Sequence, residues 1–131
     1  MKITADTNVL LRTLVDDDEA QTARAVALLE TAKQVAVSLQ TLCELVWVLR
    51  GCYGVGRTDL AAAVRSLLNT RNVVVNRPAT EAGLALLEAG GDFADGVIAY
   101  DGTWLGAEIF VSFDKKAVSL LTRQGQAARL L

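Results

Sequence analysis

Short runs of consecutive apolar residues alternate along the chain with longer stretches in which apolar residues recur every three to four positions. The short runs predict strands at residues 2–5, 35–38, 73–75 and 109–111. The periodic stretches predict helices at residues 9–15, 19–33, 41–50, 60–68, 80–87, 92–100 and 117–131, with room for a last short strand near the end. The chain therefore alternates between strand and helix.

This alternation favours a three-layer α/β/α sandwich around a mainly parallel central sheet of four to five strands. A length of 131 residues suits one domain covering residues 1–131. The sequence has neither a signal-peptide pattern nor an apolar run of membrane-spanning length, which favours a cytoplasmic protein without membrane association.

Charge and histidine content narrow the possible chemistry. The chain carries 13 basic and 15 acidic residues, so it has no general attraction for nucleic acid; a polyanionic partner needs local basic groups or metal ions. It contains 0 histidines, which removes the commonest general base and every mechanism that depends on a Ser-His or Cys-His pair. Any reaction must depend on carboxylates, metal ions or both.

Acidic residues follow or flank the predicted strands. Asp6 and Asp114 directly follow strands, and Glu44 and Asp95 fall near the beginning of helices. Because parallel strands have their carboxyl ends at the same edge of a sheet, these carboxylates are expected to share one pocket. The alternative for Asp6 alone is an N-cap, a role that aspartate fills well.

Such a pocket needs positive charge. Two like charges about 4 Å apart repel each other by about 4 kcal/mol at an effective dielectric constant of about 20. Either some carboxylates are protonated or divalent cations neutralise them, and cations are the better explanation. A set of oxygen ligands favours one or two Mg²⁺ or Mn²⁺ ions. The chemistry expected of such ions is hydrolysis of a phosphodiester bond.

Four motifs in this order resemble the PIN domain, and within it the VapC-type toxins of toxin–antitoxin pairs. The motifs are Asp6-Thr7-Asn8, the helix containing Glu44, Asp92-Phe93-Ala94-Asp95 and Ser112-Phe113-Asp114. The resemblance implies a Mg²⁺- or Mn²⁺-dependent endoribonuclease that acts on RNA, forms a homodimer and is inhibited by a cognate antitoxin protein.

The resemblance also assigns roles to residues. Asp6, Glu44, Asp95 and Asp114 match the acidic quartet that binds the metal and carries out catalysis, and Thr7, Asn8 and Ser112 match the polar residues that order it. Asp92 competes with Asp95 as a ligand, but Asp95 precedes an apolar pair as the motif requires, so Asp92 is given a supporting role. Gly96 stands where the family usually has alanine, and a glycine there is expected to weaken the helix by about 1 kcal/mol.

The basic residues expected to bind RNA are Arg12, Lys115 and Lys116, with Arg50 and Arg57 as further candidates; each could instead be an ordinary solvated charge. Aromatic residues are only 5% of the chain, which argues against a broad base-stacking platform. Trp47 is predicted to lie in the core or at an interface.

Two other functions compete with the nuclease. One is a catalytically silent PIN-like module that only binds RNA or a partner. The other is a phosphatase of the haloacid dehalogenase type, which also begins with an aspartate at the end of a strand. That family has a second aspartate two residues later, where this chain has Asn8.

Overall fold

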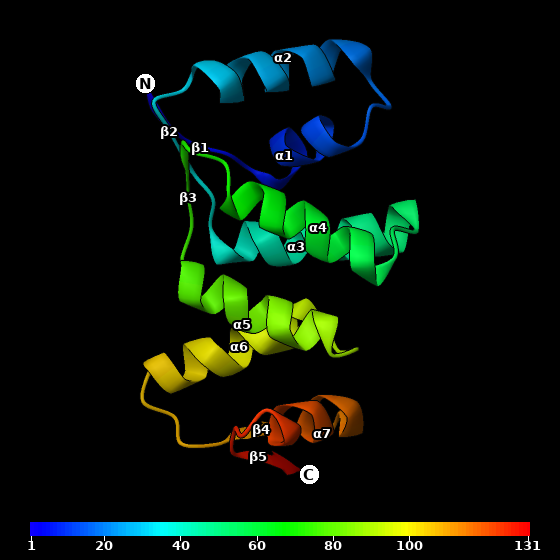
Figure 1. The fold of residues 1–131 in the computed structure, drawn as a ribbon, viewed down its shortest axis with the longest axis vertical. Coiled ribbons are helices and arrows are strands. Elements are labelled where there is room, and N and C mark those ends of the chain that lie inside the picture. Colours follow the sequence, from blue (N-terminus) through cyan, green and yellow to red (C-terminus); the bar gives the residue numbers. More distant parts are fainter. The chain divides into compact units, whose positions relative to one another are not determined.

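The computed structural model describes all residues, Met1–Leu131, and divides them into two compact units (Figure 1). Unit 1 comprises Met1–Asn76 and unit 2 comprises Arg77–Leu131. Helices and strands alternate through both units, and every pair of neighbouring strands is parallel. The predicted parallel α/β architecture is therefore confirmed. The five strands pair as one three-stranded and one two-stranded sheet.

The sheet of unit 1 has the order β1-β2-β3. Its strands are β1 (Lys2–Thr4), β2 (Gln34–Ala36) and β3 (Val73–Val74). Ile3 is paired with Val35, and Val35 with Val73. Val35 on the central strand is fully buried, as expected for a parallel strand covered on both faces.

Four helices belong to unit 1: α1 (Thr7–Leu14), α2 (Glu19–Thr31), α3 (Leu39–Tyr53) and α4 (Arg57–Leu68). Asp6, Asp18 and Ser38 cap the first three through side-chain oxygens that accept backbone N–H groups. Helix α3 is longer at both ends than the predicted 41–50. It continues past Gly51, since a single glycine weakens a helix by only about 1 kcal/mol, and it ends before Gly54, whose φ of 64° gives a left-handed C-cap.

Unit 2 contains α5 (Arg77–Glu88), α6 (Phe93–Trp104), β4 (Phe110–Ser112), α7 (Lys115–Arg123) and β5 (Ala128–Leu130). Its two strands are parallel, with Phe110 opposite Ala128. The tail, residues 117–131, was predicted as a helix with room for a last short strand, and it consists of helix α7 followed by strand β5. The core of this unit joins α5, α6 and α7 through Leu86, Ala99, Leu120 and Leu121, against which Phe110 and Ala128 pack.

Helices α5 and α6 approach each other closely at two glycines. A Cβ added to Gly96 would lie 2.5 Å from the carbonyl oxygen of Ala82 and 2.8 Å from the Cα of Gly83. A Cβ added to Gly83 would lie 2.6 Å from the ring of Phe93. The expectation that Gly96 merely weakens its helix is therefore incomplete, because the missing side chain allows α6 to pack directly against α5.

Two further observations complete the fold. No helix combines the length and the apolar composition needed to cross a lipid bilayer. Trp47 does not lie in the core: its exposed fraction is 71%, although α3 buries the neighbouring Leu45 and Val46. Of the two places predicted for Trp47, the core is therefore wrong, and an interface stays a prediction.

Candidate metal and nuclease site

In unit 1, the predicted site residues lie at the carboxyl edge of the sheet. Strand β1 leads to Asp6, and the adjacent parallel strand β2 leads to Ser38 and the beginning of α3. The backbone N–H of Ala5 donates to the carbonyl oxygen of Ala36 at 3.1 Å, so the two strand ends stay paired up to this edge. Asp6 and the amino-terminal end of α3 therefore lie at the same edge of the sheet. Glu44 belongs to the amino-terminal half of that helix.

Asp6 caps helix α1 and is also available for a ligand. Its Oδ1 accepts the backbone N–H of Val9 at 3.0 Å, so the capping role considered from the sequence is real. The residue is exposed, and its Oδ2 accepts no hydrogen bond from the protein. Glu44 is also exposed. No hydrogen bond joins Thr7 or Asn8 to Asp6, so the ordering role predicted for these two residues stays a prediction.

In unit 2, three aspartates lie at the beginnings of α6 and α7. Asp92 caps α6 by accepting the backbone N–H of Ala94 at 3.2 Å, and Asp95 follows in the first turn. Asp114 caps α7 by accepting the backbone N–H groups of Lys116 at 2.9 Å and Ala117 at 3.1 Å. Both helices thus direct the positive ends of their dipoles toward carboxylates.

The charges of these aspartates influence one another. Partial burial raises the pKa of Asp95, and the negative charges of Asp92 and then Asp114 raise it further. Burial and these two negative charges therefore disfavour the ionised form of Asp95, and a bound cation would favour it.

Ser112 orders the loop that carries Asp114. The backbone N–H of Asp114 donates to the Ser112 Oγ at 2.9 Å, which fixes the turn between β4 and α7. The contact orders the backbone beside Asp114, and the role of Ser112 in ordering a metal site stays a prediction. The same turn places Lys115 and Lys116 at the exposed start of α7.

The donor chemistry of these residues fits a hard divalent cation. Every candidate ligand is a carboxylate oxygen, which suits Mg²⁺ or Mn²⁺, and the charges of Asp92 and Asp114 act on Asp95. Neither unit by itself brings three or more Asp, Glu, Cys or His side chains close enough to hold an ion. Asp6 and Glu44 belong to unit 1, whereas Asp95 and Asp114 belong to unit 2, so the predicted quartet of ligands stays a prediction.

Arg12 has structural partners that the sequence did not reveal. Its guanidinium forms an ion pair with Asp17, and its side chain is only 12% exposed. The Tyr53 hydroxyl donates to the other oxygen of the same carboxylate at 2.7 Å. These three residues come from α1, the α1–α2 loop and the end of α3. The spacing of Asp17 and Tyr53, 36 residues apart, gives no local signal for this contact.

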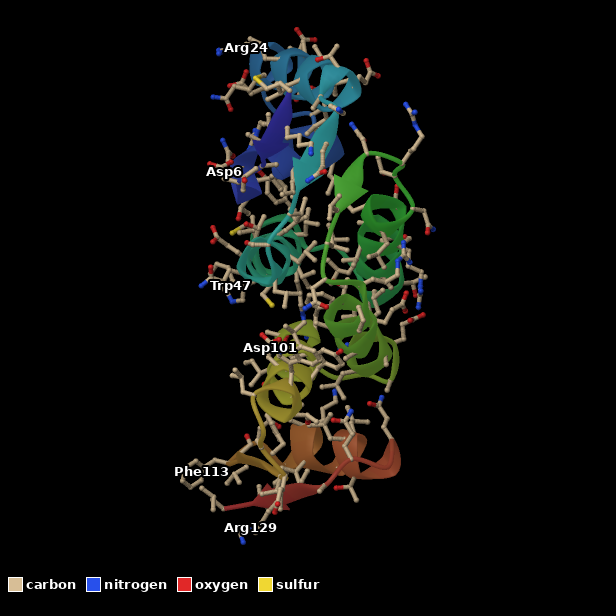
Figure 2. The ribbon with its side chains drawn as sticks, turned by 90° about the vertical axis from the view of Figure 1, so that its left-hand side faces the viewer. Asp6, Arg24, Trp47, Asp101, Phe113 and Arg129 are labelled. Atoms are coloured by element: carbon tan, nitrogen blue, oxygen red, sulfur yellow. The ribbon has the colours of Figure 1, made fainter.

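A groove of about 580 Å³ lies between α1 and α2 of unit 1. Asn8, Arg12 and Arg24 supply its polar lining, and Val9 and Leu28 part of its apolar lining. Figure 2 shows Asp6 and Arg24 on the same side of unit 1. Asn8, which lies two residues after Asp6 in the sequence, therefore lines this groove. So does Arg12, one of the basic residues predicted to bind RNA.

Comparison with known proteins identifies the family of the chain. No curated protein sequence matches the chain. The PIN domain, by contrast, matches residues 3–120, a range that includes Asp6, Glu44, Asp95 and Asp114. The match extends over most of the chain and over both compact units. The chain therefore belongs to the PIN domain family.

Proposed function

We propose that this PIN domain is a Mg²⁺- or Mn²⁺-dependent endoribonuclease. PIN domains are generally nucleases. The observation that carries the proposal is Asp95, a partly buried carboxyl group in the first turn of α6, whose pKa is raised by its burial and then by the negative charges of Asp92 and Asp114. Carboxylates of this kind in a chain without histidine support hydrolysis assisted by a metal ion. The phosphatase alternative, already weakened by Asn8, has no further support.

The residues that would hold one or two ions are Asp6, Glu44, Asp95 and Asp114. When bound, a divalent cation lowers the pKa of a water molecule and offsets the charge of the phosphodiester. The N-caps made by Asp6 and Asp114 fix these carboxylates without using all of their oxygens. Ser112 holds Asp114 in place, and Asp92 adds negative charge beside Asp95.

Positive charges beside the site would bind the RNA backbone. Lys115 and Lys116 are exposed and directly follow Asp114, which supports a role for them in contacting phosphates of RNA bound near Asp114. Arg12 lines the groove that begins near Asp6, where its ion pair with Asp17 holds it in position. Because the chain has a net charge of -2, these local cations supply the attraction that the whole molecule lacks.

Replacement of the first aspartate tests the proposal. Asp6→Asn keeps a capping side chain but removes a charged ligand, so the purified protein should fold normally and lose Mg²⁺-dependent cleavage of RNA. Asp18→Asn is the matched control, because Asp18 caps α2 in the same way, accepting the N–H of Gln21 at 3.1 Å. Undiminished cleavage by Asp6→Asn would overturn the assignment. Cleavage that is absent from the unaltered protein as well would leave a silent binding module.

We extend the proposal to the cell: the protein acts in the cytoplasm as the toxin of a toxin–antitoxin pair. The support is the ordered set of motifs that resembles the VapC-type toxins. Expression of the chain alone should arrest growth, and Asp6→Asn should not. Co-expression of a small protein encoded by an adjoining reading frame should restore growth. Normal growth during expression of the active nuclease would contradict the toxin role.

Two further proposals concern assembly. The matched residues 3–120 belong to both compact units, which supports their action as one domain. The resemblance also supports a homodimer, for which light scattering gives the direct measurement. A mass corresponding to one 14.0 kDa chain at all concentrations would exclude the dimer.

A further inference from the structure

Trp47 is the most exposed large apolar side chain of α3; Tyr53, the last residue of the same helix, is 37% exposed and donates its hydroxyl to Asp17. The exposed fraction of Trp47 is 71%, whereas Leu45, Val46 and Leu49 of the same helix are buried. Gly51, one turn further along the helix, has no atom of another segment within 4 Å of the position of a Cβ. One side of the indole ring therefore adjoins open space.

The exposed face of α3 carries an acidic, an aromatic and a basic side chain one after another along the helix. Glu44, Trp47 and Arg50 follow one another at intervals of three residues, a spacing that makes successive side chains neighbours on a helix. All three are exposed. They cover about 9 Å of helix axis, at a rise of about 1.5 Å per residue. A candidate metal ligand, an indole ring and a guanidinium thus form a strip, which we call the α3 strip.

The α3 strip lies on the same side of unit 1 as the first aspartate of the candidate site. Figure 2 shows Asp6 and Trp47 on one side of this unit. Asp6 and α3 also begin from adjacent parallel strands. A strand of RNA held at Asp6 and Glu44 can therefore continue along α3 over the indole ring.

The composition of the α3 strip favours RNA over an apolar protein partner. The exposed α3 residues nearest to Trp47 along the strip are Glu44, Arg50 and Gly51, and none of them extends an apolar patch. Protein interfaces bury continuous apolar surface at their centre. A single indole beside a guanidinium instead matches the combination that binds single strands, in which bases stack on aromatic rings and cations contact phosphates.

We propose that Trp47 stacks on a nucleobase of single-stranded RNA next to the bond held at Glu44, and that Arg50 contacts the adjacent phosphate. This inference rests on the proposed nuclease function and identifies its substrate as unpaired RNA. Stacking is tolerant of base identity, since every base has an aromatic face. Trp47 therefore acts as a positioning residue that affects KM more than kcat.

The two tryptophans of the chain allow a direct test of binding. In full-length protein carrying Asp6→Asn, the additional change Trp104→Phe leaves Trp47 as the only tryptophan, and Trp47→Phe leaves Trp104, which is 80% exposed. Titration with a short oligouridylate should quench the fluorescence of Trp47 to saturation and leave that of Trp104 unchanged. An unchanged Trp47 signal while fluorescence anisotropy shows the oligonucleotide bound would overturn the proposal.

Cleavage assays give a second, independent readout. Trp47→Ala should raise KM for a single-stranded substrate by on the order of tenfold and change kcat little, since a base–aromatic stack is lost. Trp47→Phe should restore most of the affinity, and Trp104→Ala should have no effect. If Trp47→Ala instead halves the mass measured by light scattering and leaves RNA binding intact, the residue belongs to an interface between copies and the proposal is wrong. Absence of cleavage by the unaltered protein would refute the nuclease, whereas the quenching experiment would still decide whether Trp47 binds RNA.

Discussion

Gly96 of α6 lies directly against Gly83 of α5: a Cβ at Gly96 would be only 2.8 Å from the Gly83 Cα. Gly96 also follows Asp95, the aspartate whose pKa is raised by burial and by Asp92 and Asp114. The close packing of the two helices therefore fixes the backbone that carries this carboxylate. A larger residue at position 96 would push α6 away from α5 and would displace the Asp95 carboxylate with it.

The first prediction concerns Gly96→Ala. The added methyl group would overlap the backbone of α5, including the Ala82 carbonyl oxygen at 2.5 Å, and backbone cannot rotate away as a flexible side chain can. We expect a loss of about 1–3 kcal/mol in the free energy of unfolding, measured by urea denaturation. Gly102→Ala is the matched control on the same helix, because its Cβ would meet only the Ala107 Cβ at 3.8 Å. It should stabilise the protein by up to about 1 kcal/mol. Equal effects of the two substitutions would contradict the close packing.

The second prediction concerns metal and Asp95. Because burial and the charges of Asp92 and Asp114 disfavour ionised Asp95, a bound cation should stabilise the folded state. Thermal denaturation should therefore shift to higher temperature when Mg²⁺ or Mn²⁺ is added, by mass action on the folded protein.

Asp95→Asn separates this effect from general salt effects. It should raise the melting temperature without metal, because the crowded charge is gone, and it should reduce the shift caused by metal. Asp59→Asn, which changes an exposed first-turn residue of α4, should leave the shift intact. A metal shift of the same size in Asp95→Asn would exclude Asp95 as a ligand.

The helices and their caps could be predicted from the sequence because the signals are local. Asp6 caps α1, a role that the sequence allowed for it, and Gly54 ends α3 through its positive φ. Strand partners could not be predicted to the same degree: β4 pairs with β5, which forms from a tail that also has helical periodicity. Pairing depends on segments distant in the sequence, for which a local pattern carries no information.

The candidate site likewise has some features that local sequence predicts and others that depend on contacts between distant segments. That Asp6, Asp92 and Asp114 adjoin strand ends or helix starts follows from local sequence, and the structure has them there. The partners of Arg12 and the exposure of Trp47 depend on how distant segments pack. An apolar helix indicates that most of its side chains are buried, but it does not indicate which one is left outside.

The third prediction concerns Asn72 of unit 1, whose side chain caps the carboxyl end of α2. Its Nδ2 donates to the carbonyl oxygens of Leu29 at 2.8 Å and Ala32 at 2.9 Å, at the carboxyl end of α2. Asn72→Ala leaves these acceptors without their partner in a partly buried region and should lower the free energy of unfolding by about 1–3 kcal/mol. Asn69→Ala, at an exposed position three residues earlier, should cost less. If the two variants lost the same free energy of unfolding, water would have replaced Asn72 as the hydrogen-bond donor to these carbonyl groups.

The fourth prediction concerns pH and the hydrogen bond from Tyr53 to Asp17. This hydrogen bond is the largest cause of the lowered pKa of Asp17; burial opposes it, and the charge of Arg12 lowers the pKa further. The same hydrogen bond raises the pKa of Tyr53 above 10.0. The stabilisation linked to Asp17 is therefore present above its ordinary pKa of 3.8 and is lost as the pH falls from 3.8 toward the lowered value. That linked to Tyr53 is present below 10.0 and is lost as the pH rises through the raised value.

Tyr53→Phe tests the acid limb because it removes the hydroxyl group that lowers the pKa of Asp17 but keeps the ring. The variant should be less stable than the unaltered protein at neutral pH, and the difference should shrink when melting temperatures are compared between about pH 7 and about pH 3. Tyr100→Phe is the control, since no hydrogen bond joins the other tyrosine hydroxyl to the protein. Because Arg12 would lose the residue that orients its carboxylate partner, Tyr53→Phe should also weaken RNA binding in a salt-dependent way. A stability difference that stays constant across this range would show that Asp17 keeps its ordinary pKa, and the contact between the two segments would then contribute packing alone.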